Sequence, residues 1–129
     1  MTTYMRNPMS RRTIGVVSAA LALALGLAAC GGGGEPPACE DPQAAGTVTM
    51  ADFSYEPGCV EAVPGDSLEV VNEGQAPHTF TVGTDGPEAE VDVAAGERGT
   101  LTVPDLAAGT YRVVCTYHPQ MEAALRIGG

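Results

Sequence analysis

Residues 111–121 read Tyr-Arg-Val-Val-Cys-Thr-Tyr-His-Pro-Gln-Met, and they hold most of the side chains that indicate what this chain binds. The first half has the apolar pattern of a β-strand, and the second half is a short loop. This loop carries a thiol at Cys115, an imidazole at His118 and a thioether at Met121, in the spacing Cys-x2-His-x2-Met. A soft sulfur donor, a nitrogen donor and a weak sulfur donor close together favour copper.

The only other histidine of the chain, His78, lies far upstream of this loop. Two histidines and one cysteine in a trigonal arrangement, with a distant axial methionine, form the blue-copper electron-transfer site. Each residue taken singly has an ordinary structural explanation, because a buried cysteine often behaves as a small hydrophobe. Both histidines of the chain nevertheless fall where one site needs them. The predicted metal ligands are therefore His78, Cys115, His118 and Met121.

Zinc is the alternative metal for two histidines and a cysteine. The methionine argues for copper, because a thioether adds little to a zinc site.

Short strand-like runs separated by turn residues fill the chain from Gly46 onward, and no stretch shows a long helical period. The runs cover residues 47–50, 59–63, 67–73, 78–82, 89–93, 99–103, 109–115 and 121–127. Eight short strands at this spacing predict an all-β sandwich.

Strand periodicity places the candidate ligands relative to the core. Side chains alternate between the two faces of a strand, and His78, Cys115 and Met121 each share a face with apolar residues of their own strand. These three side chains are therefore expected to point inward from strand ends. His118 lies in the loop and is expected to reach the metal from the solvent side.

The first residues predict export and lipid attachment. Arg11 and Arg12 precede an apolar run at residues 14–29, which is too short for a membrane span of the usual length. This run ends Leu-Ala-Ala-Cys at Cys30, which resembles the bacterial lipobox and implies a lipoprotein signal peptide over residues 1–29 with lipidation of Cys30. Acyl chains on that cysteine would hold the protein durably to a membrane. A signal anchor or a cleaved soluble precursor is the alternative, and both the general and the twin-arginine export routes stay open.

Residues 30–45 are predicted to be a lipid-anchored flexible tether, because four consecutive glycines open this stretch. The folded domain is predicted over residues 46–129. Two cysteines, Cys39 and Cys59, remain unassigned, and an exported protein lies in an oxidising compartment, which predicts a disulfide between them. Free thiols are one alternative. A bridge from Cys59 to Cys115 is another, and it would abolish the copper site.

The charge of the chain excludes some classes of partner. From Cys30 onward there are three arginines, no lysine and 16 acidic residues, which gives a net charge of −13. This surface argues against nucleic acid and anionic lipid as electrostatic partners. It favours either a basic protein partner or simply solubility.

Residues 46–129 resemble the cupredoxins, the blue copper protein family. The loop spacing Cys-x2-His-x2-Met is most similar to that of the amicyanins, whereas plastocyanin-like members have a longer gap before the methionine. The upstream spacing Asn-x5-His from Asn72, with Pro77 before the histidine, also matches. One departure is Thr79, which stands where many members have an asparagine that ties the two ligand loops together.

The resemblance implies an eight-stranded Greek-key β-sandwich that holds one copper ion through the four predicted ligands. Because these ligands leave no position for a substrate, the chain is interpreted as a single-electron carrier and not as an enzyme. The expected partner is a redox protein with a basic face, such as a cytochrome or a reductase. The expected state is a monomer anchored at the outer face of the cytoplasmic membrane.

Two other function classes compete with this interpretation. The first is a cell-surface protein that buffers or delivers copper, and the residues alone do not separate it from an electron carrier. The second is a metal-free sandwich used for adhesion or as a structural module. A catalytic role such as nitrite reduction needs a second, open copper site, for which the chain has no spare histidine.

Overall fold

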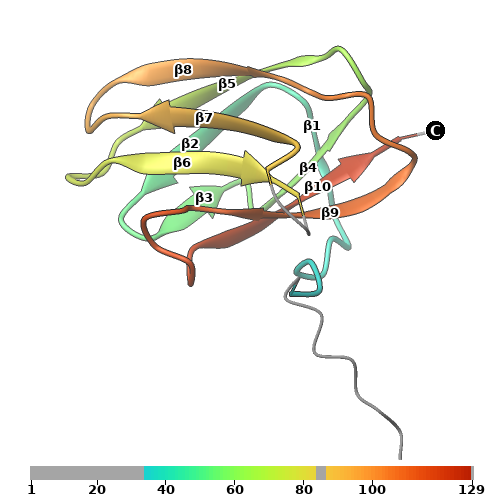
Figure 1. The fold of residues 1–129 in the computed structure, drawn as a ribbon, viewed down its shortest axis with the longest axis horizontal. Coiled ribbons are helices and arrows are strands. Elements are labelled where there is room, and N and C mark those ends of the chain that lie inside the picture. Colours follow the sequence, from blue (N-terminus) through green and yellow to red (C-terminus); the bar gives the residue numbers. More distant parts are fainter. Residues whose placement is uncertain (1–33, 84–86, 129) are drawn as a thin grey trace, which may run out of the picture. The chain divides into compact units, whose positions relative to one another are not determined.

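Two β-sheets packed face to face make up the part of the chain that the computed structural model describes, residues 34–83 and 87–128 (Figure 1). The strands are β1 (Gln43–Ala44), β2 (Thr47–Ala51), β3 (Ser54–Glu56), β4 (Cys59–Ala62), β5 (Ser67–Asn72), β6 (His78–Val82), β7 (Ala89–Val93), β8 (Arg98–Thr102), β9 (Gly109–Val114) and β10 (Glu122–Ile127). The larger sheet has the order β1-β4-β10-β9-β6-β7, and the smaller sheet has the order β3-β2-β5-β8.

The all-β sandwich predicted from the sequence is confirmed, and all eight predicted strands are present with bounds within one residue. The described residues add two short strands, β1 and β3, of two and three residues. Strands this short show too little alternation to be detected from sequence. Strand β1 pairs in parallel with β4 and lies inside residues 30–45, so regular pairing reaches into the stretch predicted to be a tether.

The core lies between the sheets and follows from the alternation of side chains. Strand β5 buries Leu68, Val70 and Asn72 on one face and leaves the other face exposed or half-buried. Strand β6 differs, because all five of its residues are buried. Phe80 and Val82 join the apolar core, while the threonines of β6 find hydrogen-bond partners instead. Full burial of one Val, Leu or Phe side chain contributes about 1.5–3 kcal/mol.

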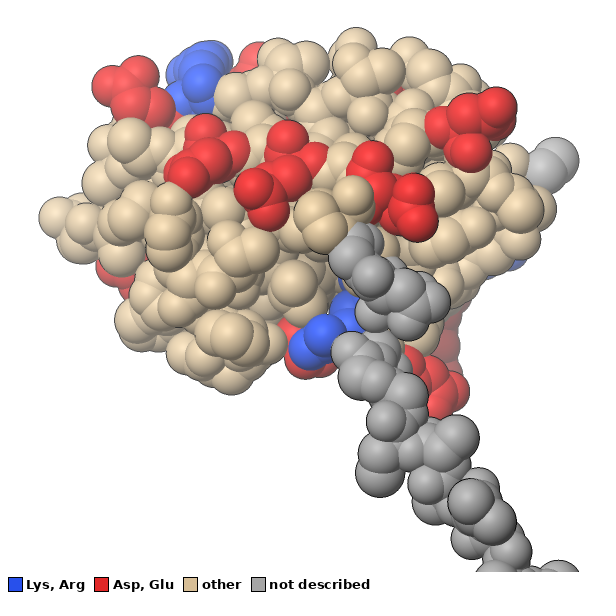
Figure 2. Space-filling model, viewed as in Figure 1, with Lys and Arg blue, Asp and Glu red and all other residues tan. Residues whose placement is uncertain are grey.

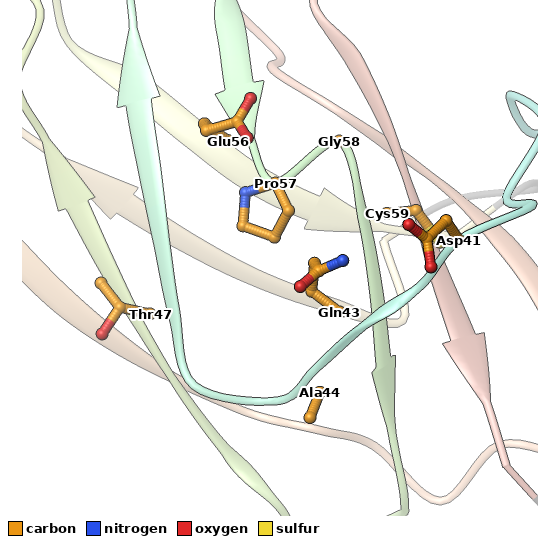
Figure 3. A pocket seen from close by; sticks show the side chains of 8 residues that line it. All are labelled: Asp41, Gln43, Ala44, Thr47, Glu56, Pro57, Gly58 and Cys59. Atoms are coloured by element: carbon orange, nitrogen blue, oxygen red, sulfur yellow. The ribbon is translucent and has the colours of Figure 1, made fainter.

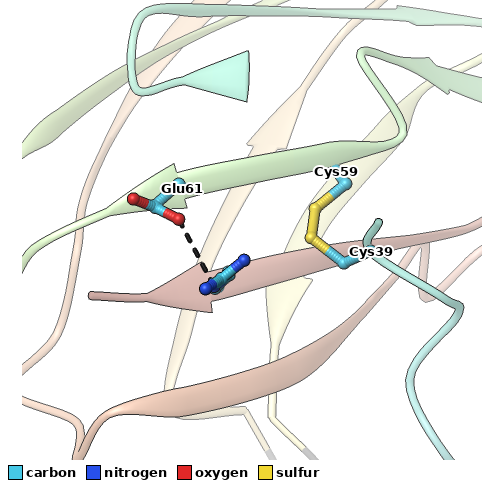
Figure 4. Close-up of a disulfide and its surroundings, with 4 residues drawn as sticks. Cys39, Cys59 and Glu61 are labelled. Carbon is cyan, nitrogen blue, oxygen red and sulfur yellow. Dashed lines mark ion pairs between the residues drawn. A yellow bond between two sulfur atoms is a disulfide. The ribbon is translucent and has the colours of Figure 1, made fainter. Parts of the chain in front are cut away.

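The amino-terminal end of the described chain is joined to the larger sheet by a disulfide. Cys39 and Cys59 form the predicted bridge, with their Cα atoms 5.5 Å apart. Figure 4 shows this bridge on β4 close to Glu61, which pairs with Arg126 of β10 at 3.3 Å. Cys115 stays a free cysteine, so the alternative bridge that would remove the candidate site is absent.

The predicted signal peptide and the predicted lipidation site, Cys30, lie outside the described residues. Within residues 34–83 and 87–128, no helix is long and apolar enough to cross a membrane.

Candidate metal centre

Strand pairing brings together residues that are far apart in the sequence. Strands β6 and β9 run antiparallel with Thr81 opposite Val114, so the start of β6 lies near the end of β9. His78 is the first residue of β6, and Cys115 directly follows β9. Met121 directly precedes β10, which is antiparallel to β9. Three strand ends therefore meet at one end of the larger sheet.

The three predicted nitrogen and thiol ligands converge there. The Sγ atom of Cys115 lies 3.7 Å from Nδ1 of His78 and 3.7 Å from Nδ1 of His118. The donor atoms of all three residues lie within 4.8 Å of one another. His78 and Cys115 are fully buried, whereas His118 is half-buried, which agrees with its expected approach from the solvent side.

The loop that carries three of the candidate ligands is closed by its own backbone. The amide of His118 donates to the carbonyl of Cys115 at 3.1 Å, and the amide of Met121 donates to the carbonyl of His118 at 2.8 Å. The amide of Cys115 in turn donates to the carbonyl of Met121 at 3.1 Å. These bonds hold the short loop in one conformation, and Met121 is fully buried at its end.

Asn72 shapes the segment that leads to His78. Its Nδ2 donates to the carbonyls of Ala76 at 2.8 Å and Val93 at 2.9 Å, and its Oδ1 accepts the amide of Gly74 at 2.9 Å. The side chain is fully buried, and each of its polar atoms has a partner. The buried amide therefore fixes the conformation of the loop that precedes the histidine.

Thr79 joins the two candidate ligand segments through its backbone amide and its hydroxyl. Its backbone amide donates to Sγ of Cys115 at 3.3 Å, and its hydroxyl accepts the amide of Thr116 at 2.9 Å. The hydroxyl also lies 2.8 Å from that of Thr81, which donates to the carboxylate of Glu90 at 2.8 Å. A threonine hydroxyl thus ties the loops together in this chain.

The turn between β2 and β3 also reaches the site, and sequence reasoning did not identify it. Oδ1 of Asp52 lies 2.9 Å from Nε2 of His78. The ring of Phe53 meets the ring of His118 edge-on with centroids 4.8 Å apart, and 52% of Phe53 is exposed. The amide of Gln75, and after it the ring of His78, hold the pKa of Asp52 below its usual value. A two-residue turn has no pattern that indicates which distant side chains it contacts.

The donor set fits copper. Two imidazole nitrogens and one buried thiol converge, and the only thioether of the same loop follows at Met121. Cysteine binds metals as the thiolate, and soft sulfur with imidazole is the ligand combination that suits copper. The side chains that would hold the ion are His78, Cys115 and His118, with Met121 as the weak axial contact.

A surface hollow of the described chain lies elsewhere and has none of the candidate ligands in its lining. Figure 3 shows it between the start of β2 and the turn from β3 to β4, near the disulfide. Its polar lining includes Gln43 and two carboxylates, Asp41 and Glu56, but no histidine and no free thiol.

Comparisons with known proteins agree with this geometry. The family described as "Cupredoxin-like domain" matches residues 17–126. The methylamine utilization protein MauL of Methylophilus methylotrophus is 29% identical over 120 residues, which cover 88% of this chain and 68% of MauL.

The fold of this chain is also similar to solved structures of cupredoxins. A Cu(I) form of an amicyanin mutant is 30% identical with a TM-score of 0.51, over 69% of this chain and 87% of amicyanin. A purple cupredoxin from Nitrosopumilus maritimus has a TM-score of 0.55 over 64% of this chain and 99% of its own. Its identity of 16% supports the fold alone.

Proposed function

This chain belongs to the family of cupredoxin-like domains, and from that premise we propose that it is a type 1 (blue) copper protein that carries single electrons between redox partners. The observation that carries the proposal is the convergence of Nδ1 of His78, Nδ1 of His118 and Sγ of Cys115 at the end of the larger sheet. Copper bound there would supply the reversible change between Cu(I) and Cu(II).

The surrounding residues would keep the ligands in nearly the same positions in both oxidation states. Cys115 is held by the amide of Thr79 on its sulfur and by two hydrogen bonds through its own backbone. His78 is held at the start of a fully buried strand. Rigid ligands reorganise little when the charge of the metal changes, and a small reorganisation favours fast electron transfer. The four ligands leave no position for a substrate, so we propose a carrier and not an enzyme.

Electrons would enter and leave through the exposed rim of the site. His118 is half-buried, and Phe53, Tyr117 and Pro119 beside it are exposed. This rim offers an apolar contact area around a ligand ring. Figure 2 shows acidic side chains spread over one face of the molecule with few arginines among them. A basic face on a cytochrome or a reductase would be attracted to this surface.

The proposed location rests on the lipobox-like sequence before Cys30. Lipid attachment at that cysteine would anchor a monomer to the outer face of the cytoplasmic membrane. Mass spectrometry of the protein from bacterial membranes tests this, because a lipidated form begins at Cys30 and carries acyl chains.

Copper titration of the purified chain tests the proposed function. Addition of Cu(II) should produce an intense blue absorption with one copper ion per chain. Cys115→Ser should abolish the blue colour and leave the sandwich folded, as far-ultraviolet circular dichroism would show. A blue Cys115→Ser variant, or a colourless wild-type protein, would contradict the proposal.

The electron self-exchange rate then separates the carrier from a copper-delivery protein. A carrier should exchange electrons rapidly and retain its copper when challenged with a chelator. Slow exchange with readily lost copper would instead support copper buffering or delivery.

A further inference from the structure

We propose that Asp52 is a positioning residue for the metal ligand His78, and that Gly74 provides the space in which its carboxylate reaches the imidazole. This inference rests on the proposed copper site, because it concerns a ligand of that site. Both residues lie outside the set of predicted ligands. Their roles follow from contacts among the turn between β2 and β3, the loop before β6 and the first residue of β6.

The two ring nitrogens of His78 face different partners. Nδ1 lies 3.7 Å from Sγ of Cys115, and Nε2 lies 2.9 Å from Oδ1 of Asp52. An ionised carboxylate only accepts hydrogen bonds, so the hydrogen of the neutral ring must lie on Nε2. The lone pair of Nδ1 is then free and directed at the site. Asp52 thereby selects the tautomer that a metal ligand needs and fixes the plane of the ring.

The carboxylate is itself held in place by the segment that it organises. The amide of Gln75 donates to both oxygens of Asp52, at 3.1 and 3.0 Å. The amide of Ala76 also donates to Oδ1 of Asp52, at 3.4 Å. The side chain of His78 is 0% exposed and that of Asp52 is 32% exposed, so the bond to the ring is shielded from water on the histidine side. Asp52 therefore joins the β2–β3 turn to the loop that carries the ligand.

Gly74 supports the same conclusion through an independent observation. A Cβ atom added at Gly74 would lie 2.3 Å from Oδ1 of Asp52 and 3.0 Å from Nε2 of His78. Contact at 2.3 Å is far inside van der Waals distance, so any side chain at this position would displace the carboxylate. The φ angle of Gly74 is not positive, which means that space and not backbone conformation demands glycine here.

The bond to a carboxylate has a chemical consequence for the metal. A histidine that donates its second N–H to a carboxylate is a more basic ligand, and loss of such a partner typically costs 10–100-fold in metal affinity or activity. A more basic imidazole favours Cu(II) over Cu(I), because the higher charge gains more from electron donation. Asp52 is therefore expected to lower the reduction potential of the site.

Redox titration of the copper-loaded full chain tests this role with three variants. Asp52→Asn keeps the shape of the side chain but removes the charge, and it should lower the ratio of Cu(II) to Cu(I) affinity about tenfold, which raises the potential by about 59 mV. Gly74→Ala should also raise the potential, because the added methyl group would displace the carboxylate of Asp52 without removing its charge. A general effect of surface charge would leave Gly74→Ala unchanged, so this variant separates positioning from long-range electrostatics.

The matched control is Asp66→Asn. Asp66 also lies in a turn and accepts a backbone amide, that of Val63 at 2.9 Å, but it precedes β5 at the end opposite to Asn72. This control removes the same charge from a comparable turn and keeps an oxygen that can accept the amide, and its potential should match that of the wild type. Potentials for Asp52→Asn and Gly74→Ala that equal the control value would overturn the proposal.

Nitrogen NMR of the metal-free chain gives a readout that does not depend on bound copper. The ring of His78 should carry its hydrogen on Nε2 in the wild type, and Asp52→Ala should give a mixture of both tautomers. A hydrogen on Nδ1 in the wild type would overturn the inference. If the wild-type chain fails to turn blue with copper but shows the Nε2 tautomer, the proposed function fails while the role of Asp52 stands.

Discussion

Thr79 connects three segments of the fold through its amide, its hydroxyl and its carbonyl. Its amide contacts the sulfur of Cys115, its hydroxyl accepts the amide of Thr116, and its carbonyl accepts the hydroxyl of Tyr55 at 2.6 Å. Because Glu90 only accepts hydrogen bonds, Thr81 must donate to it and accept from Thr79. This fixed donor order lets the hydroxyl of Thr79 accept the amide of Thr116 and donate to Thr81. The identity of the residue could be seen in the sequence, but its partners could not.

The buried hydroxyl of Tyr55 leads to a prediction about stability at alkaline pH. Burial, followed by the nearby charge of Cys115, raises the pKa of Tyr55 above its usual value of 10.0. The unfolded chain therefore loses this proton first as the pH rises. The stability that Tyr55 contributes is fully present below about pH 10 and is lost as the pH rises above that value.

Denaturant unfolding at pH 9 and at pH 11 measures this effect. The free energy of unfolding of the wild type should fall more between these pH values than that of Tyr55→Phe, by up to about 1.4 kcal/mol per pH unit. Tyr55→Phe should itself cost about 1 kcal/mol at neutral pH, because the hydrogen bond to Thr79 is lost. An identical alkaline slope for both proteins would contradict the prediction.

At the scale of the elements, periodicity predicted every strand that is long enough to alternate. Strand β5 alternates cleanly and was located to within one residue. Strand β3 has three residues and exists because it pairs with β2 across the turn that carries Asp52. Pairing partners depend on which strands meet in space, so this hairpin and its contact with the site could not be read from local sequence.

The close contact between β7 and β8 leads to a prediction about stability when Gly99 is substituted. These strands belong to different sheets, and a Cβ atom added at Gly99 of β8 would lie 2.7 Å from Cγ2 of Val91 and 3.2 Å from Cγ2 of Val93 on β7. Gly99→Ala should therefore force the strands apart and lower the free energy of unfolding by about 1–3 kcal/mol. Thermal and urea unfolding would measure the loss.

Gly46→Ala is the control for this substitution. Gly46 is exposed, has no positive φ angle, and an added Cβ there would meet only a carbonyl oxygen at 3.9 Å. Its stability should stay within about 0.5 kcal/mol of the wild type. Equal stability of the two variants would show that β7 and β8 can separate without cost.

At the scale of the whole molecule, the acidic surface is expected to favour the approach of cations over anions. The chain from Cys30 onward carries a net charge of −13, and Figure 2 shows separate acidic side chains on the visible face, several of them in a band across its upper half. A negative surface attracts cations and repels anions. Dissolved salt screens this attraction, and at 0.1 M the screening length is about 10 Å. Charge distribution therefore influences association rates more than it influences the fold.

Stopped-flow oxidation of the reduced copper protein tests this field. The rate with a small cationic redox complex should fall as ionic strength rises, and the rate with an anionic complex should increase. A neutral complex serves as the control and should show little dependence. Equal salt dependence for all three reagents would show that the acidic surface does not steer electron-transfer partners.

The sequence by itself determined the fold class, eight strands and the positions of the candidate ligands. Alternation of side chains is local. His78 and His118 are distinctive because the chain has only two histidines, and the spacing Cys-x2-His-x2-Met marks Cys115 and Met121. Only the tertiary structure showed that three donor atoms lie within 4.8 Å of one another.

The structure alone also decided how the candidate ligands are supported. Oδ1 of Asp52 lies 2.9 Å from Nε2 of His78 although the two residues are 26 positions apart, and the missing side chain of Gly74 leaves room for that carboxylate. Such contacts follow from strand pairing and sheet packing, which join segments that no local pattern relates. The residue types of the candidate ligands can be read from the sequence, whereas the orientation of their side chains depends on the folded chain.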